Sequence, residues 1–254
     1  YDKLNRLTYT DYIYKGTYPN CFWEYFYYDK MGNISIIDRG GQEQIQNIDY
    51  LTYWYDGNKV TSIQDDYLSQ NQYSIKEYQD KSAYYTPNEM TYDANGNLTK
   101  DLDRDIYTIK YNYLNLPEII QFKSGNQIKN KYDANGSKLG VRYVVVQEGV
   151  YNPLLPGEVN ENLDVNEFDN VTVTGTDYVN NIEYNVSRYF DWDVTFEPQE
   201  GKMLWKVYNP EGYTEGILLY YSTPRYCYYR RDHLGNIREV WQAEYTRSGQ
   251  RRAA

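Results

Sequence analysis

Apolar and aromatic residues alternate with polar residues over short runs along most of the chain, which is the pattern of half-buried β-strands. The rhythm is densest between residues 92 and 146, where Asn/Gly/Pro turns separate the runs 107–113, 118–122 and 127–132. No segment shows sustained helical periodicity, and the best helical candidate, 65–78, is polar nearly all round. The pattern therefore predicts an all-β fold of consecutive antiparallel hairpins.

One short motif recurs in these runs and supplies their turns. It reads Tyr-Asp, two variable residues, Gly-Asn and an apolar residue, and its clearest copy runs from Tyr92 to Leu98. The pair Asn95-Gly96 predicts a two-residue type I′ turn, because both central residues of that turn need positive φ. Further copies, some degenerate, begin at residues 1, 28, 55, 111 and 132. This spacing indicates one hairpin unit per repeat, with connections of variable length.

The motif residues are expected to build the fold and not to carry chemistry. The repeat Asp should accept hydrogen bonds from the amides of its own turn. The residues to which we assign this structural role are Tyr28, Asp29, Gly32, Asn33, Tyr92, Asp93, Gly96, Asn97, Tyr132, Asp133, Gly136, Asp232, His233, Gly235 and Asn236.

The spacing of Asp93, Asn95 and Asn97 superficially resembles the start of a calcium loop. An EF-hand loop needs Gly at position six and a bidentate Glu at position twelve, whereas Gly96 falls at position four. A tight turn accounts for the same residues. We therefore predict no metal ion at these turns and no cofactor in the chain.

His233 is the only histidine, so mechanisms and zinc sites that need two histidines are excluded. It could be a general base oriented by Asp232, or a turn residue whose imidazole hydrogen-bonds a neighbouring loop. The second role is favoured, because Ala94-Asn95 occupies the same place in another copy. No pattern brings two carboxylates together for glycoside hydrolysis. We therefore expect no catalytic residue and no enzymatic activity.

Composition changes this picture in two ways. The chain has 34 tyrosines among 254 residues, which indicates a thin, tyrosine-faced sheet because the hydroxyl seeks water or a partner. Tyr and Trp beside Asn and Asp are also typical of a sugar-binding face, although cross-strand aromatic ladders are the favoured interpretation. A net charge of -10 disfavours nucleic acid and anionic membranes as partners. No apolar run is long enough to predict a membrane span.

The chain divides into three regions. Residues 1–148 carry the hairpin repeats, 149–225 form a divergent region with an acidic stretch that we predict to be an insertion or exposed loop, and 226–254 hold a closing copy of the motif and a basic tail. Cys21 and Cys227 could form one bridge, but their spacing favours two buried thiols. The first residue lies in mid-repeat, so we expect a piece of a longer polypeptide.

The repeated Tyr-Asp-x-x-Gly-Asn-Leu lettering and the Asp-His-Leu-Gly-Asn motif within Tyr228–Val240 resemble the RHS/YD-repeat family. The stretch Asp177–Gly216 is similar to the segment before that motif in RHS-like proteins of the Bacteroidetes. Together these resemblances cover nearly the whole chain. They imply a curved, spiral sheet that forms part of a hollow shell, as in insecticidal Tc toxins, Rhs polymorphic toxins and teneurins.

In that family the shell encloses or presents a variable C-terminal domain, often a toxin. Family members that carry a toxin usually have an Asp-Pro-rich self-cleavage segment after the core. The sequence before Ala254 contains none, so no cleavage residue is assigned.

The resemblance implies a structural segment of a bacterial shell that is secreted or displayed on the cell surface. Its partners would be further repeats and a C-terminal cargo of the same polypeptide. The alternative expectation is a surface module that binds carbohydrate or a receptor through Tyr/Trp faces. Open sheet edges predict self-association by strand pairing, and a strictly monomeric species at high concentration would count against it.

Overall fold

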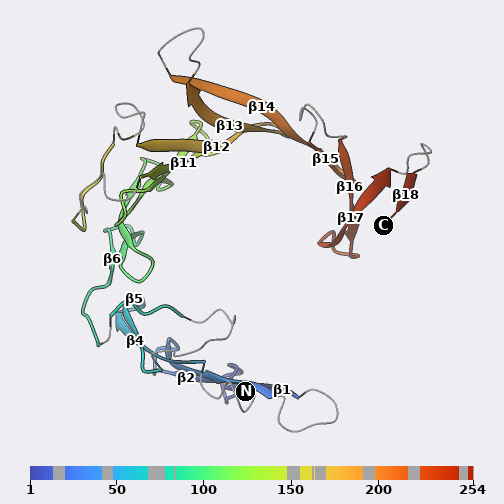
Figure 1. Cartoon of the computed structure of the whole chain (residues 1–254). Helices are drawn as coiled ribbons and strands as arrows, with labels where there is room; N and C mark the ends of the chain where they lie inside the picture. Colours follow the sequence, from blue (N-terminus) through green and yellow to red (C-terminus); the bar gives the residue numbers. More distant parts are fainter. Residues whose placement is uncertain are drawn as a thin grey trace. The chain divides into compact units, whose positions relative to one another are not determined.

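A computed structural model describes residues 1–13, 21–41, 48–67, 78–82, 84–147, 155–161, 163, 170–190, 198–216, 224–245 and 251–253. The fold of these residues is nearly all β, as predicted, and Figure 1 shows the strands in chain order. The candidate helix at 65–78 falls mostly outside the described residues. Within them, no helix is long and apolar enough to span a membrane.

The described residues form eighteen strands, most of them short. They are β1 (Tyr9–Ile13), β2 (Cys21–Tyr28), β3 (Ile34–Gly40), β4 (Asp49–Asp56), β5 (Lys59–Asp65), β6 (Met90–Tyr92), β7 (Leu98–Asp101), β8 (Ile106–Tyr111), β9 (Pro117–Phe122), β10 (Gln127–Tyr132), β11 (Lys138–Val146), β12 (Val171–Val179), β13 (Ile182–Phe190), β14 (Pro198–Asn209), β15 (Gly212–Glu215), β16 (Arg225–Arg231), β17 (Ile237–Tyr245) and β18 (Arg251–Ala253).

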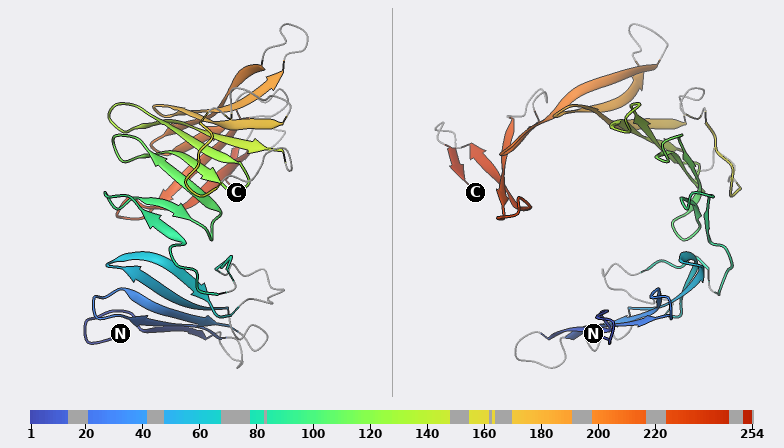
Figure 2. Two further views of the ribbon diagram at one scale, coloured as in Figure 1. Left: turned by 90° about the vertical axis from the view of Figure 1, so that its left-hand side faces the viewer. Right: turned by 180° about the vertical axis from the view of Figure 1, so that it is seen from behind.

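The chain forms two compact units. The first consists of Tyr1–Ile109 with Leu155–Glu158, and the second of Lys110–Leu154 with Val159–Ala254. In the first unit, β1 to β5 form an antiparallel sheet in chain order, and β6 pairs with β7. In the second, neighbours in sequence from β9 to β18 are also neighbours in the sheet, which Figure 2 shows as a single layer of strands. This arrangement confirms consecutive antiparallel hairpins.

Each unit has a small apolar core. In the first, Leu51, Ile63 and Met90 are buried together, and Tyr92 and Leu98 of the repeat motif pack against them. In the second, the buried set is Val144, Val146, Leu163 and Val173. Leu163 belongs to the stretch that the sequence indicated as an insertion or exposed loop. Leu163 is not exposed, because it packs against the valines of β11 and β12, so exposure does not hold at this residue, and the alternative of an insertion stays a prediction.

Candidate functional site

The repeat turn is built around the carboxylate of its Asp. At Asp93, Oδ1 accepts hydrogen bonds from the backbone N–H groups of Asn95 and Asn97 at 2.9 and 2.8 Å, and Oδ2 accepts one from the Asn97 amide at 2.9 Å. The Gly96 N–H donates to the Asp93 carbonyl at 3.0 Å. The carboxylate thus occupies the turn amides, as expected of the repeat Asp.

The turn type differs from the predicted type I′. Gly96 has φ +88°, but Asn95 is not among the residues with positive φ. The N–H of Asp93 bonds to the carbonyl of Asn97, so the loop is longer than two residues. The reason lies in the side chain, because Asp93 can hold the amides of Asn95 and Asn97 together only in this wider loop. One left-handed residue is then sufficient.

Two of the hydrogen bonds at Asp93 recur in five other copies of the motif: the backbone N–H groups two and four residues later both donate to Oδ1 of the Asp or its equivalent. The acceptor is a carboxylate in four of them and the Asn112 amide oxygen in the fifth; the residues are Asp2, Asp29, Asn112, Asp133 and Asp232. Where the motif lacks Gly, Asn takes the left-handed place, with φ 60° at Asn5 and 58° at Asn115. Asn tolerates this region better than most other residues. The degenerate copies therefore keep the geometry of the clear ones.

The turn hydrogen bonds stabilise the charged form of two repeat carboxylates, Asp93 and Asp232. The side-chain amide of Asn97 and then the turn amides lower the pKa of Asp93 below its ordinary value. Asn236 and the turn amides, with Arg238, lower the pKa of Asp232 in the same way. These carboxylates are thus held as acceptors at neutral pH.

Four motif tyrosines bond to the repeat that precedes their own. Tyr28 donates its hydroxyl to the carbonyl of Leu7 at 2.7 Å, and Tyr55 donates to the carbonyl of Ile34 at 2.6 Å. Both acceptors lie five residues after the Asp (or its equivalent) of the preceding turn, as does Pro117, which accepts from Tyr132 at 3.3 Å.

Tyr92 makes the equivalent bond at 2.8 Å to Val60, just beyond the shorter turn at Gly57. The regular position of Tyr before Asp was visible in the sequence, but its partner was not. The hydroxyl bond fixes the distance between successive turns.

His233 lies in a repeat turn, but its imidazole does not make the hydrogen bond that the sequence suggested. Its side chain is exposed, and among the described residues it makes no hydrogen bond, so the expected bond to a neighbouring loop is absent there. Asp232 is engaged by its own turn and by Arg238, whose Nε lies 2.8 Å from Oδ2. The arrangement therefore gives no support to an Asp232–His233 pair.

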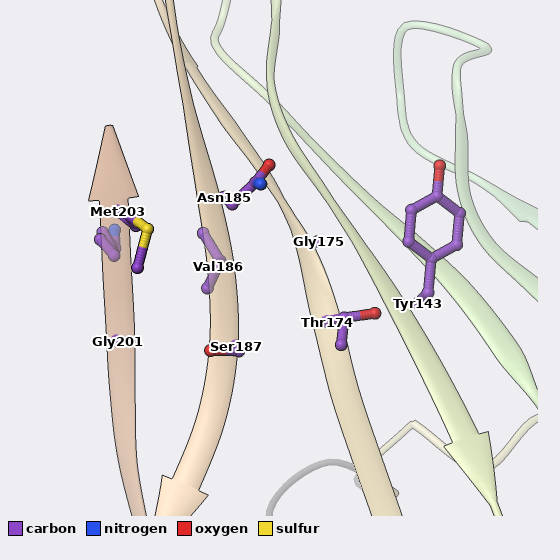
Figure 3. A pocket seen from close by; sticks show the side chains of 9 residues that line it. Tyr143, Thr174, Gly175, Asn185, Val186, Ser187, Gly201 and Met203 are labelled. Atoms are coloured by element: carbon purple, nitrogen blue, oxygen red, sulfur yellow. The ribbon is translucent and has the colours of Figure 1, made fainter. Parts of the chain in front are cut away.

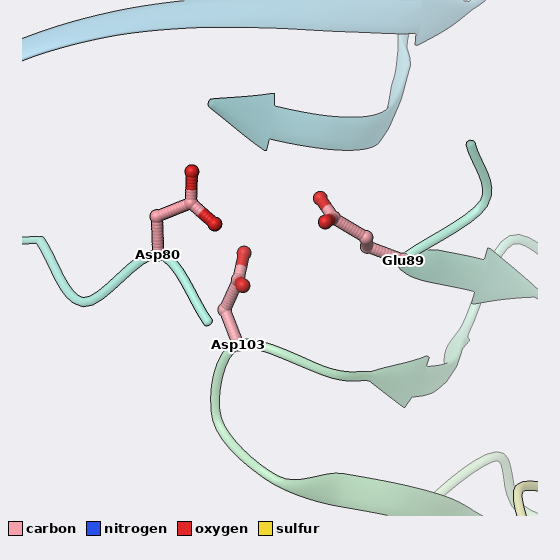
Figure 4. Close-up of side chains that lie close together, drawn as sticks. All are labelled: Asp80, Glu89 and Asp103. Atoms are coloured by element: carbon pink, nitrogen blue, oxygen red, sulfur yellow. The ribbon is translucent and has the colours of Figure 1, made fainter. Parts of the chain in front are cut away.

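Three carboxylates that the sequence did not connect meet in the first unit. Oxygen atoms of Asp80, Glu89 and Asp103 lie within 4.8 Å of one another, and Figure 4 shows the three side chains converging from separate segments. Such oxygen sets are the ligands that hard cations prefer. Here protein groups already donate to all three carboxylates.

Glu89 accepts from Ser62 at 2.7 Å and Ser82 at 2.5 Å, and Asp103 accepts from the Tyr78 hydroxyl at 2.5 Å. Asp80 accepts from the Asp65 N–H at 3.0 Å.

Burial and the repulsion between neighbouring carboxylates raise the pKa values of two acids in this region. Burial, with the charges of Glu89 and Asp80, raises the pKa of Asp103 above its ordinary value. Burial, with the charges of Asp49 and Asp80, raises the pKa of Asp65 to about 6. Asp49 is fully buried and forms an ion pair with Arg39. These hydrogen bonds hold residues 78–82 against β4 and β5, so the network stabilises the fold.

Tyrosine ladders cross the strands of the second unit as the composition suggested. The rings of Tyr208 and Tyr213, which are direct partners on β14 and β15, have centroids 5.9 Å apart, and Tyr229 on β16 lies 5.9 Å from Tyr213. Cys227, beside this ladder, is a buried free thiol, as expected for it. The side chain of Cys21 lies outside the described residues.

A groove lies on the solvent side of β11 to β14. Its volume is about 710 Å³, and it is lined by Tyr143, Thr174, Gly175, Asn185, Val186, Ser187, Gly201, Lys202 and Met203 (Figure 3). This volume is within the range of about 300–1,000 Å³ that small-molecule sites occupy. No motif predicts this groove, because its lining residues come from four separate strands.

An ion-pair group lies on the opposite side of the same strands. Arg142 and Lys202 both bind the carboxylate of Asp177, with Nη1 and Nζ at 2.7 and 2.5 Å. Gly140 makes room for the ion pair, since a Cβ there would lie 2.7 Å from Asp177 Oδ1. A Cβ on Gly175 would clash first with the backbone carbonyl of Val141 on the neighbouring strand, and would lie 3.0 Å from Arg142 Cδ. Burial alone would raise the pKa of Asp177, but the two cations lower it.

The fold defines a repeat protein made of consecutive antiparallel hairpins. No family model and no curated protein matches the chain. Among solved structures, it is similar to the crystal structure of TcdB2-TccC3, with 11% identity over 91% of this chain and a TM-score of 0.47. The complex TcdB2-TccC3-Cdc42 gives 11% identity and a TM-score of 0.48, and TcdB2-TccC3 without its hypervariable C-terminal region gives 0.37. The chain spans 10% of the length of each.

Proposed function

We propose that this chain is a structural segment of an RHS/YD-type wall, which encloses or presents another domain of the same polypeptide. The observation that carries the proposal is the bond from four motif tyrosines to the residues that follow the preceding turn. Tyr28, Tyr55 and Tyr132 each donate the side-chain hydroxyl to a backbone carbonyl at an equivalent position. The same hydrogen bond therefore holds one hairpin against the next at three places. A chain that adds hairpins in this way extends a sheet, and an extended sheet is suited to forming a boundary.

The other features agree with a role without catalysis. Buried carboxylates of the first unit accept hydrogen bonds from protein donors. Asp232, the carboxylate next to His233, is bound by Arg238 and not by the imidazole. We therefore propose that the segment is not an enzyme. Following the family resemblance, we also propose that it is secreted or displayed on a bacterial surface.

Limited proteolysis of the full-length native polypeptide tests the proposal. If the chain is a wall, the domain that it encloses or presents is protected in the wild type. The double variant Tyr55→Phe/Tyr132→Phe removes two bonds between repeats and should speed cleavage of that domain. The matched control is Tyr27→Phe/Tyr113→Phe, because both of these rings are exposed and no hydrogen bond holds them in the described structure. Equal cleavage rates in the wild type and the first variant would contradict the proposal.

A further inference from the structure

We propose that the groove on β11 to β14 binds a neutral carbohydrate, with Tyr143 as the platform for a sugar ring. This inference goes beyond the structural role and does not depend on it. It rests on the way in which the strand register places one aromatic ring, three polar side chains and a gap on one face.

The register builds the groove from two rows of residues. Tyr143, Thr174, Ser187 and Gly201 are successive cross-strand partners on the four strands. Asn185 and Met203 are partners in the next row. Direct partners in antiparallel strands point to the same face, so the side chains of both rows share the solvent side. Gly201 ends its row without a side chain, which leaves space beside Ser187 and Met203.

The polar side chains of the groove are available to a ligand. Thr174, Asn185 and Ser187 are exposed, and none of them makes a side-chain hydrogen bond to another described residue. Together they offer two hydroxyls and one amide, which can both donate and accept. This donor and acceptor set matches the hydroxyls of a sugar.

The apolar surface of the groove lies beside these groups. Tyr143 is 46% exposed and Met203 is 41% exposed. An aromatic ring offers a flat apolar face on which the C–H side of a sugar ring can stack. Tyr143 and Thr174 are direct partners, so the platform and the first hydroxyl are adjacent, as Figure 3 shows.

The charge of the groove selects against ionic ligands. Among the described residues that line it there is no carboxylate and one basic residue, Lys202, which is paired with Asp177 on the opposite face. The ligand that satisfies these groups is therefore neutral and polar, with an apolar face.

The strand arrangement also selects against an extended peptide. All four strands have neighbours on both sides, so their backbone groups already pair within the sheet. Peptides that join a sheet do so at an open edge, through main-chain bonds. In this groove the strands therefore offer no open edge to a peptide, and the side chains supply the hydrogen-bonding groups.

Saturation-transfer NMR with a panel of neutral glucan, galactan, xylan and chitin oligosaccharides tests the proposal. At least one probe should bind the wild-type chain, and Tyr143→Ala should weaken that binding by about 3- to 10-fold, the range expected for one aromatic contact. Tyr143→Phe keeps the ring and should retain binding. Asn185→Ala/Ser187→Ala should weaken it by about 3- to 10-fold through lost hydrogen bonds.

The matched control is Tyr228→Ala, because Tyr228 is a similarly exposed ring (43%) in the same unit and lies outside the groove. It should bind like the wild type. An unchanged thermal midpoint in Tyr143→Ala shows that the variant is folded. The proposal is overturned if no neutral probe binds, if only charged sugars bind, or if folded Tyr143→Ala binds as tightly as the wild type.

Discussion

In the first unit several acids are buried beside a small core of Leu51, Ile63 and Met90, whereas in the second unit, among the described residues, the core is mostly valine and the buried polar side chains are two amides. Asp49, Asp65, Glu89, Asp101 and Asp103 are all buried in the first unit. In the second, the buried polar side chains among the described residues are Gln121 and Gln127, which bond to each other at 2.5 Å. Both units use the same repeat turn, so the difference lies in what fills the sheet face between turns.

The same repeat turn is therefore compatible with two kinds of interior. A buried carboxylate must be paired or hydrogen-bonded, so the first unit depends on Arg39 and Arg104 and on the donors of residues 78–82. The valine core of the second unit needs no partner of this kind. The first unit should therefore respond to pH and to the loss of a single cation, and the second should respond much less.

The largest expected effect is the loss of Arg39. Arg39→Met leaves Asp49 fully buried without its cation, which should destabilise the first unit by about 3–5 kcal/mol. The matched variant in the second unit is Arg142→Met, which leaves Asp177 paired with Lys202 and should cost much less. Hydrogen exchange resolved by unit measures both effects. Equal losses in the two variants would show that the interiors do not differ in this way.

The next effect is a dependence on pH that is confined to the first unit. The pKa of Asp65 is raised to about 6 in the fold, so its contribution is fully present below its unfolded pKa and is lost as the pH rises through about 6. Asp103 is shifted in the same direction. The first unit should be more stable at about pH 5 than at pH 7.5, by roughly 1.5 kcal/mol from Asp65, to which Asp103 adds, because pH 5 already lies above the unfolded pKa of Asp65.

Asp177 in the second unit has a lowered pKa, so its contribution is lost only at more acid pH. The measurement is hydrogen exchange at the two pH values, corrected for the intrinsic rate. Asp65→Asn should flatten the response of the first unit. A steeper response in the second unit than in the first would contradict the comparison.

A smaller effect concerns the turn that both units share. Gly96→Ala places a Cβ at φ +88°, which should cost about 1–2 kcal/mol even though the nearest atom, Lys59 Cε, is 3.7 Å away. Gly136→Ala, at φ +85° in the second unit, should cost at least as much, because its Cβ would also approach Leu116 Cδ1 at 3.3 Å. Denaturant unfolding measures both, and Ala94→Gly serves as the control within the same loop.

The smallest effect tests the link between repeats. Tyr55→Phe removes the hydroxyl bond to Ile34 and should destabilise the first unit by about 0.5–1.5 kcal/mol. Tyr27→Phe, in the same sheet, alters an exposed ring and should be neutral. If the two variants unfold alike, the tyrosine bond does not hold successive repeats together.

The sequence was informative where interactions are local. The Tyr-Asp-x-x-Gly-Asn spacing was enough to predict the hairpins and the carboxylate bonds at Asp93, because donor and acceptor lie within four residues. The prediction of a type I′ turn was wrong. It rested on the turn propensity of Asn95-Gly96 and left out the hydrogen bonds that the Asp93 carboxylate makes with the loop.

The rest depends on contacts between distant segments. Asp80, Glu89 and Asp103 meet only after the chain has folded, and Leu163 packs under β11 and β12 from a stretch whose composition suggested exposure. The groove at Tyr143 depends on the register of four strands, and hydrophobic alternation does not fix which residues become cross-strand partners.

If these hairpins form a wall for another part of the same polypeptide, cryo-electron microscopy of the full-length native polypeptide should show it. We predict that the sheet continues from neighbouring repeats through these residues, with the tyrosine bonds at each junction, and that one face is turned toward a further domain. A structure in which this chain stands as a separate domain, with no repeats adjoining it and no domain facing it, would contradict the claim.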